Sequence, residues 1–224
     1  MQENKIKKKI VMVGNGSFSE TLLYYITTFT EWEIVAYADE FVSEEGATHK
    51  EKPFINLNDI VEKYPPDEYG IVLGIGYRKM NTIRKRLYLK LKEYGYCFPN
   101  FIHPTAIVHN TIMGDANIIM QNVMFEPNAK IGSNTIIWGG VSIGHNANIG
   151  SHNHFAGSSV VAGNVKMGDG CFVGNQATVR DGATVADYTL LGAGVYLAKD
   201  TSPYDVVVPA RAVVLEGKKS TDFI

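Results

Sequence analysis

The sequence predicts two fold classes in one chain: a small α/β domain over residues 1–100, then a parallel β-helix, an all-β solenoid, over residues 101–224. Two observations support this prediction. In the first half, apolar strand-like runs alternate with amphipathic helical segments, which is typical of β-α-β units and a parallel sheet. From residue 101 onward the large apolar residues instead recur at every sixth position, a period that marks stacked short strands.

The N-terminal half contains three apolar runs that we expect to form buried strands. They cover residues 9–16 (KIVMVGNG), 33–40 (EIVAYADE) and 69–77 (YGIVLGIGY). Helices are expected over residues 19–29, 55–64 and 81–95. Ser17 or Ser19 is the expected N-cap of the first helix, and Asn58 that of the second. This half is therefore expected to form a small parallel sheet with helices on its faces.

The repeat in the C-terminal half runs without an insertion, and every hexad from Phe101 to Leu197 begins with a large apolar residue. The fifth position is mostly small, and the fourth favours Asn and Gly, which tolerate a left-handed backbone. Three hexads close one triangular coil, so residues about 18 apart stack. We expect the first and fifth positions to point inward, the third and fourth to form corners, and the second and sixth to face outward.

One outward column of the expected β-helix is apolar except for a histidine. It consists of Ile118, Ile136, His154, Phe172 and Leu190. An exposed apolar column needs a partner, so we interpret this side as a subunit interface. Rotational closure then makes a homotrimer the natural assembly.

A second outward column contains only glycine: Gly114, Gly132, Gly150 and Gly168. Missing side chains would leave the backbone open to a ligand or a neighbouring chain. Equally, glycine could simply ease the packing of one coil on the next. The sequence does not separate these two interpretations.

Composition excludes several classes of protein. The chain is 45 % hydrophobic and 20 % charged, with a formal net charge of −2, so it carries no electrostatic footprint for nucleic acid. Cys97 and Cys171 lie far apart without metal-ligand spacing and indicate free thiols in a reducing compartment. The apolar run near the start is too short for a signal peptide, and no stretch is long enough to span a membrane. We expect a cytoplasmic protein.

The hexads, with the segment IGHNANIGSHNHFAG at residues 143–157, resemble those of left-handed β-helix acyltransferases. With its N-terminal half included, the chain resembles bacterial nucleotide-sugar N-acetyltransferases of the bacillosamine-pathway type, relatives of sialic-acid O-acetyltransferase-like proteins. The resemblance covers residues 8–215. It implies a Rossmann-like N-terminal domain that holds a nucleotide sugar, and a trimeric left-handed β-helix that binds acetyl-CoA between subunits.

The resemblance also implies roles for two histidines. His145 matches the family's general base, and His154, nine residues later, matches the contact to acetyl-CoA. Family members often carry Glu or Asp after the base, where this chain has Asn146. Asn146 is therefore a candidate catalytic residue, although a purely structural ladder along one corner would also account for it, formed by Asn110, Asn128, Asn146 and Asn164.

Further residues are assigned to acetyl-CoA by the same resemblance. Backbone N–H groups beside Gly163 or Ala193 match the family's cofactor contacts. Near the C-terminus, the segment VVVPAR supplies Pro209 and Arg211, although Val207 replaces a glycine that is common in the family.

The candidates for the nucleotide sugar lie at the ends of the expected N-terminal strands. Gly14, Gly16 and Ser17 form a turn between a strand and a helix, the usual context for phosphate binding at a helix N-terminus. Asp39 ends the next strand, where it could hydrogen-bond a ribose or a base. The third strand leads into a set that could equally be a plain helix start: Gly76, Tyr77, Lys79 and Asn81.

Together these features predict an acetyl-CoA-dependent N-acetyltransferase that acts on a nucleotide-linked amino-dideoxy sugar, with the 4-amino-4,6-dideoxy sugars as the expected class. A sugar O-acetyltransferase and a non-catalytic β-helix binding protein are the alternatives. No third ligand converges with His145 and His154, so no metal is expected. His103, His109 and His152 are expected to be structural or solvated. Because His145 and His154 lie half a coil apart, we expect them to meet only between subunits.

Overall fold

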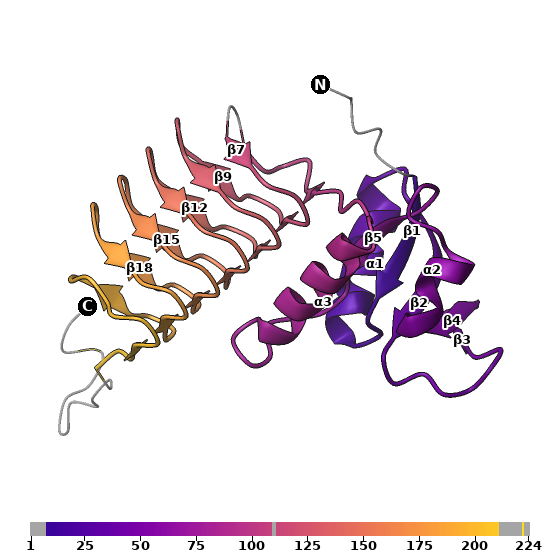
Figure 1. Ribbon diagram of the computed structural model, residues 1–224. Coiled ribbons are helices and arrows are strands. Elements are labelled where there is room, and N and C mark those ends of the chain that lie inside the picture. Colours follow the sequence, from indigo (N-terminus) through magenta and orange to yellow (C-terminus); the bar gives the residue numbers. More distant parts are fainter. Residues whose placement is uncertain (1–7, 109–110, 211–220, 222–224) are drawn as a thin grey trace.

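The computed structural model describes residues 8–108, 111–210 and 221, and it contains an α/β domain beside a regular stack of coils (Figure 1). The α/β domain has one sheet with strand order β3-β4-β2-β1-β5. Its strands are β1 (Lys9–Val13), β2 (Glu33–Asp39), β3 (Thr48–His49), β4 (Lys52–Asn56) and β5 (Gly70–Leu73). Its helices are α1 (Ser17–Phe29), the 3-10 helix η1 (Leu57–Asp59), α2 (Ile60–Lys63) and α3 (Thr82–Glu93). All neighbouring strands are parallel except β3 and β4.

The helix expected over residues 55–64 is wrong in its first part. Phe54, Ile55 and Asn56 pair with β2 in strand β4, and only Ile60–Lys63 forms an α-helix. The expected cap Asn58 lies inside the preceding 3-10 helix η1, which Asn56 caps by accepting a hydrogen bond from the backbone N–H of residue 58. The N-cap of α2 is Asp59, without a side-chain cap. The apolar pattern of residues 55–64 fits a strand as well as a helix. Over so few residues, periodicity alone does not distinguish the two.

The expected cap of α1 is also wrong. The N-cap is Gly16, without any side-chain cap, and Ser17 is already helical. Ser19 is buried inside the first turn, where its hydroxyl lies 2.7 Å from the Met12 sulfur.

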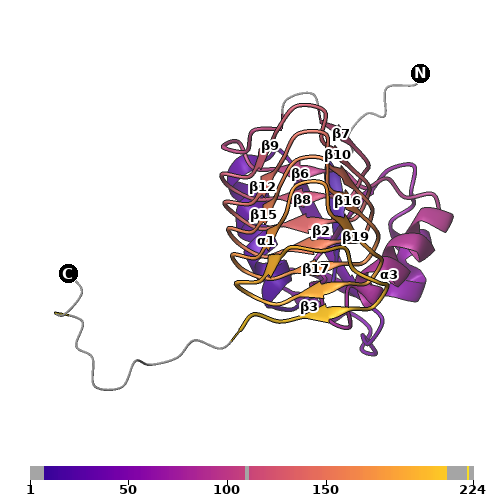
Figure 2. The same ribbon diagram turned by 90° about the vertical axis from the view of Figure 1, so that its left-hand side faces the viewer.

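The C-terminal half folds as the expected parallel β-helix, whose stacked coils are seen from the C-terminal end in Figure 2. Its two-residue strands form three faces. The first face has the order β22-β20-β17-β14-β11-β8-β6, the second β21-β18-β15-β12-β9, and the third β19-β16-β13-β10-β7.

The strands of the first face, named the docked face below, are β6 (Phe101–Ile102), β8 (Ile118–Ile119), β11 (Ile136–Ile137), β14 (His154–Phe155), β17 (Phe172–Val173), β20 (Leu190–Leu191) and β22 (Val206–Val207). The second, the open face, has β9 (Met124–Phe125), β12 (Ser142–Ile143), β15 (Val160–Val161), β18 (Thr178–Val179) and β21 (Tyr196–Leu197). The third, the polar face, has β7 (Ile112–Met113), β10 (Lys130–Ile131), β13 (Asn148–Ile149), β16 (Lys166–Met167) and β19 (Thr184–Val185).

The hexad rule holds along these coils. From Ile119 to Leu197 the first positions are buried in one continuous apolar core, and only Ile107 and Met113 in the first coil are less covered. Fourth positions from Ala116 to Gly194 all have a positive φ. Asn and Gly recur at these corners because a left-handed backbone there costs them least.

The apolar column of the docked face is not a free surface, which corrects its interpretation as a subunit interface. Ile118 and Ile136 are buried against the chain's own N-terminal domain, in one cluster with Ile10, Leu22 and Ile26. Helix α3 lies on the side of that domain that faces the coils (Figure 1). The prediction that the apolar column is covered by a partner surface is confirmed, but that surface belongs to the same chain.

The glycine column is explained by coil packing. A Cβ atom at Gly132 would lie 2.3 Å from the Ser151 hydroxyl, and one at Gly168 would lie 2.0 Å from the Asp187 carboxylate. These side chains accept hydrogen bonds from backbone N–H groups of the preceding coil, as Ser151 does from Ser133. Glycine therefore makes room for a polar ladder between successive coils.

Candidate active site

Four predicted substrate positions lie at the carboxyl edge of the N-terminal sheet. Gly14 follows β1 with φ +102°, and a Cβ there would lie 2.5 Å from the Ile75 side chain. The turns after β1 and β5 are thus in contact. A Cβ at Gly16 or Gly76 would meet no atom within 4 Å, so both backbones border open space. Asp39 ends β2, and its carboxylate accepts the N–H of Phe41 at 3.1 Å.

Helix α1 approaches β5 closely at the point where dinucleotide folds usually have a third glycine. Here that position is Ser19, and the small residue is on the opposite side: a Cβ at Gly74 would lie 2.7 Å from the Ser19 Cβ. Helix α1 therefore still packs closely against the end of β5, but the glycine that allows this contact lies after the strand and the larger residue lies in the helix. It brings Phe18 of α1 to 5.8 Å from the Trp138 ring of the β-helix.

A groove of about 650 Å³ lies where the loop after β5 meets the corner between the docked and open faces. Tyr77 comes from the N-terminal domain, and every other lining residue comes from the β-helix. They are Gln121, Asn122, Trp138, Gly139, Gly140, His154, Ala156, Gly157, Ser158, Phe172 and Asn175. A groove with aromatic walls and a few amides suits a ligand with both planar and polar parts.

His154 forms part of the wall of this groove. Its ring stacks on Phe172 at 5.1 Å and lies 4.7 Å from Tyr77. Burial, together with the positive charge of Arg84, lowers the pKa of His154 to about 3, so the imidazole is neutral at physiological pH. Its Nδ1 is buried and has no hydrogen-bond partner among the residues that the structure describes.

The loop that carries Tyr77 is anchored by two buried residues of the α3 region. Arg84 is fully buried, and its guanidinium donates to the carbonyl oxygens of Leu73, Ile75 and Ala116 at 2.8, 3.0 and 3.2 Å. Asn81 was predicted to contact the substrate, yet it is 1 % exposed, and its amide reaches the Cys171 carbonyl at 3.5 Å. The structure places Asn81 at the junction of the two domains, whereas Tyr77 and Lys79 remain exposed.

His145 lies on a different corner, between β12 of the open face and β13 of the polar face. Its imidazole is exposed, and Nδ1 lies 3.0 Å from the Asn146 amide nitrogen. Its backbone N–H donates to the Glu126 carboxylate at 2.8 Å. The Asn146 carbonyl oxygen in turn accepts from the Asn128 amide at 3.1 Å. The corner ladder of asparagines is therefore present and also contacts the candidate base.

Gly163 lies directly beside the ring of His145, one coil further along. A Cβ at this position would lie 2.6 Å from Cε1 and Nε2 of His145 and 2.9 Å from Oδ2 of Asp181. Only glycine leaves the histidine ring and the carboxylate facing the same small space.

The predicted cofactor residues are divided between the two corners. Gly163 accompanies His145, whereas His154 lines the groove. Ala193 continues the groove corner one coil beyond Asn175, and a Cβ on the neighbouring Gly192 would lie 3.5 Å from Pro209. Arg211 lies outside the described residues, as does His109.

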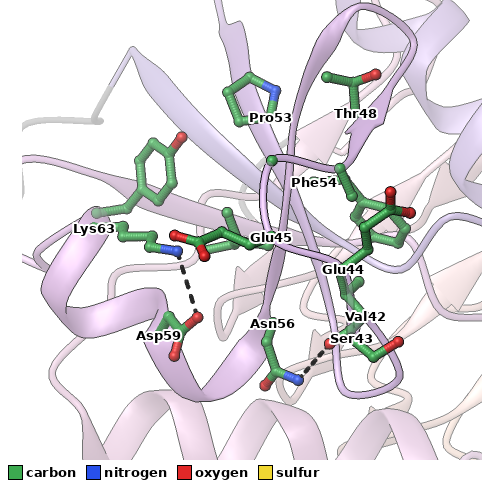
Figure 3. A pocket seen from close by; sticks show the side chains of 14 residues that line it. Val42, Ser43, Glu44, Glu45, Thr48, Pro53, Phe54, Asn56, Asp59 and Lys63 are labelled. Carbon is green, nitrogen blue, oxygen red and sulfur yellow. Dashed lines mark hydrogen bonds and ion pairs between the residues drawn. The ribbon is translucent and has the colours of Figure 1, made fainter.

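A larger cavity, of about 780 Å³, lies in the N-terminal domain between the loop after β2 and the segment from β4 to α2 (Figure 3). Asn56 holds that loop through the Val42 carbonyl at 2.7 Å. Three carboxylates line the cavity, and its lysine already pairs with Asp59 at 3.4 Å. This charge disfavours a diphosphate, and none of the predicted site residues lines the cavity, so we assign the site to the groove.

His103 and His152 have structural partners. His103 packs on Phe29 at 4.3 Å, and its Nδ1 lies 3.0 Å from the Thr105 hydroxyl. His152 occupies a left-handed corner and contacts the Asn134 amide at 2.9 Å. Within the described part of the chain, no three His, Cys, Asp or Glu residues group together as metal ligands. None of the helices there has the length and apolar character needed to cross a bilayer.

Four features of the candidate site were missed from the sequence. Glu126 precedes His145 by 19 residues, and Asp181 shares its corner column; counting in coils would have found both. The glycine pair at 139–140 also marks the groove wall. Trp138 was missed because its place in the groove depends on how the domains dock.

Comparison with known families identifies both halves. Residues 9–91 match the PglD N-terminal domain, residues 110–145 the bacterial transferase hexapeptide repeat, and residues 164–199 the hexapeptide repeat of succinyl-transferase. The chain therefore resembles bacterial transferases with hexapeptide repeats in its C-terminal half, and its N-terminal half resembles a PglD-type domain.

Solved structures confirm the fold over nearly the whole chain. PerB from Caulobacter crescentus, in complex with CoA and GDP-perosamine, is 23 % identical, with a TM-score of 0.79 over 90 % of this chain and 94 % of that one. The acetyltransferase domain of PglB from Neisseria gonorrhoeae FA1090, in complex with acetyl coenzyme A, is 18 % identical, with a TM-score of 0.76 over 91 % and 97 %. WeeI from Acinetobacter baumannii AYE is 18 % identical, with a TM-score of 0.76 over 89 % and 96 %.

Proposed function

We propose that this chain transfers an acetyl group from acetyl-CoA to the amino group of a nucleotide-linked amino-dideoxy sugar, with 4-amino-4,6-dideoxy sugars as the substrate class. The observation that carries the proposal is His145, an exposed imidazole whose Nδ1 contacts Asn146 and whose backbone is held by Glu126. The ligands of the structurally similar PerB and PglB, a nucleotide amino sugar and coenzyme A, support the choice of substrates.

The reaction is a direct attack. The amine lone pair adds to the thioester carbonyl, a C–N bond forms, and the C–S bond breaks as the CoA thiolate leaves. His145 accepts the proton that the nitrogen loses, and that proton then neutralises the thiolate. No covalent intermediate on the enzyme is needed.

The partner of His145 favours an amine over a hydroxyl acceptor. Asn146 is uncharged, so it stabilises the imidazolium less than a carboxylate would. A sugar amine is already nucleophilic when neutral, whereas a hydroxyl needs stronger assistance from the base. This supports N-acetylation over the O-acetyltransferase alternative.

A division of labour follows from the site. We propose that residues 1–100 hold the nucleotide sugar, with Gly14, Gly16 and Ser17 near the diphosphate and Asp39, Gly76, Tyr77 and Lys79 around it. Residues 101–224 would hold acetyl-CoA, with Gly163 beside the base and His154, Ala193, Pro209 and Arg211 along the cofactor. Cys97 and Cys171 are free thiols, in keeping with a cytoplasmic enzyme.

The complete site is proposed to form between subunits of a homotrimer. His145 and the groove that contains His154 lie on opposite edges of the open face. The outward residues within the strands of that face are uncharged: Met124, Ser142, Val160, Thr178 and Tyr196; Glu126 and Arg180 follow at its edge. The N-terminal domain covers the docked face at Ile118 and Ile136, and the polar face carries Lys130 and Lys166. The open face is thus the surface best suited to a neighbour that would bring its own His145 to this groove.

Release of CoA thiol from acetyl-CoA tests the proposed activity. We expect release with a nucleotide-linked 4-amino-4,6-dideoxy sugar and none above background with the matching 4-hydroxy sugar. Equal or greater release with the hydroxyl compound would establish the O-acetyltransferase instead. Absence of release with every acceptor would favour a non-catalytic binding protein.

A further inference from the structure

His145 is the end of a row of three side chains along one corner of the β-helix. The Asn128 amide donates to the Asn146 carbonyl at 3.1 Å, and the Asn146 amide nitrogen lies 3.0 Å from Nδ1 of His145. Asn128 and Asn146 both have a left-handed backbone, with φ 64° and 56°. Each asparagine therefore contacts the next member of the row while its backbone turns the corner.

The direction in which the hydrogen bonds run along this row determines the tautomer of the imidazole, that is, which ring nitrogen carries the proton. A neutral imidazole has one N–H and one lone pair, and an amide has a donor end and an acceptor end of similar shape. When the Asn146 nitrogen faces Nδ1, Nδ1 must accept and the proton resides on Nε2. When both amides are turned over, Nδ1–H donates a hydrogen bond to the Asn146 oxygen, and Nε2 is left with the lone pair.

Nε2 is the nitrogen that remains for the substrate, because Nδ1 is already within hydrogen-bonding distance of Asn146. A base that accepts a proton at Nε2 needs the arrangement in which both amides are turned over and Nδ1 carries the proton. On the other side, Oδ2 of Asp181 shares with Nε2 the space left by Gly163. That carboxylate favours a proton on Nε2, the form that cannot accept another there.

We propose that Asn128 is a positioning residue for His145: through the amide of Asn146, it sets which ring nitrogen carries the proton. This inference rests on the proposed function, in which His145 is the base. Asn128 is exposed, so its amide can turn at little cost. Glu126 fixes the His145 backbone at 2.8 Å, so the response is confined to the ring and the two amides.

Two substitutions at residue 128 have opposite consequences for the row. In N128D the side chain can only accept, so the Asn146 nitrogen turns toward it and the Asn146 oxygen toward Nδ1. N128G removes the side chain and suits the left-handed backbone, which leaves Asp181 to favour Nε2–H. The double variant N128D/N146G interrupts the row and keeps the added charge. Q176G, an amide removed from an exposed left-handed position on another corner, controls for the fold.

The measurement is ¹⁵N NMR of the ring nitrogens in the full-length protein without substrates, with the His145 signals identified by their loss in H145Q. We expect the ratio of Nδ1–H to Nε2–H in neutral His145 to be at least about five-fold higher in N128D than in N128G. The effect of N128D should disappear in N128D/N146G, and Q176G should match the wild type. In acetyl transfer, N128G should lower kcat and leave KM unchanged.

Equal ratios in N128D and N128G would overturn the proposal, as would an effect of N128D that persists without Asn146. The NMR result does not depend on turnover. If the wild type transfers no acetyl group to any amine while the ratio still follows residue 128, the proposed function fails and the positioning role stands.

Discussion

At the scale of single residues, the segment 143–157 contributes one histidine to an exposed corner of the β-helix and another to the wall of the groove. His145 is exposed at one corner, and nine residues later His154 is buried in the wall of a groove beside the N-terminal domain. The family resemblance predicts both as site residues, and the repeat predicts that one reaches a corner and the other faces outward. It could not show that His154 would be covered by Tyr77, because that depends on how the two domains dock.

The neighbour of His145 allows a direct test of its role as a base. In N146D a carboxylate would replace the amide that lies 3.0 Å from Nδ1, and it would stabilise the imidazolium that forms during attack. We expect kcat to rise by about three- to ten-fold with little change in KM. Steady-state kinetics of acetyl transfer measures this. N58D adds the same charge at an exposed position of the N-terminal domain, away from the groove, and should have no effect; a lower kcat in N146D would count against the proposed role.

At the scale of elements, helix α3 connects the two domains. Arg84 bonds to Leu73, Ile75 and Ala116, while Tyr88 and Lys92 both reach the Asp115 carboxylate of the first coils, at 2.6 and 2.8 Å. The sequence predicted this helix but not its charged inner face. A basic amphipathic helix is normally expected to keep its arginines in water, whereas here the carbonyl groups at the domain junction receive one of them.

Replacing Arg84 should destabilise the protein far more than replacing its neighbour. R84M leaves three carbonyl groups without their donor, and we expect the free energy of unfolding to fall by about 2–4 kcal/mol. In R86M, on the same helix, only the exposed ion pair with Glu40 is lost, which should cost at most about 1 kcal/mol. Urea unfolding of both variants compares them. Similar losses in the two would show that Arg84 does not hold the junction.

The docked face should make stability depend on pH. Burial lowers the pKa of His152 to about 4 and that of His154 to about 3, both from an ordinary value of 6.5. Below pH 6.5 the unfolded chain therefore binds more protons than the folded one, so the free energy of unfolding falls as the pH is lowered from 6.5 toward 3. Thermal unfolding from pH 7 to 4 should show a falling Tm.

The variant H152N separates the histidine contribution from that of the carboxylates. Asparagine tolerates the left-handed backbone of this position, and it does not titrate. The decline of Tm between pH 6.5 and 4 should be shallower in H152N than in the wild type. Identical slopes would mean that His152 is not held neutral by burial.

At the scale of the whole molecule, the repeat allowed most of the β-helix to be predicted and little of its surroundings. A six-residue period dictates which side chains point inward, and Ile143 and Phe155 are buried as it requires. The period contains no information about what covers an outer column, so Ile118 and Ile136 were assigned to another subunit rather than to the N-terminal domain. Glu126 was missed for a related reason, since it meets His145 only through the stacking of coils.

Mixed assemblies test whether the site is shared between chains. We expect H145A and H154A to be inactive alone and to regain activity when unfolded together and refolded, because some sites then combine an intact His145 with an intact His154 from a neighbour. When the two variants are mixed randomly in equal amounts, half of the chains carry an intact His145 and half of their neighbours carry an intact His154. About a quarter of the sites should then be complete, so about a quarter of the wild-type activity should return. Hybrids that contain both chains yet remain inactive would contradict a shared site.

The most direct test of the central claim is the rate at which acetyl groups reach the sugar nitrogen. The product of acetyl-CoA and a nucleotide-linked 4-amino-4,6-dideoxy sugar would be followed by mass spectrometry, with the wild type and with H145A. We predict an N-acetylated sugar nucleotide from the wild type, and a rate at least about 100-fold lower from H145A. An H145A enzyme that forms the amide at the wild-type rate, or a wild type that forms none, would contradict the account.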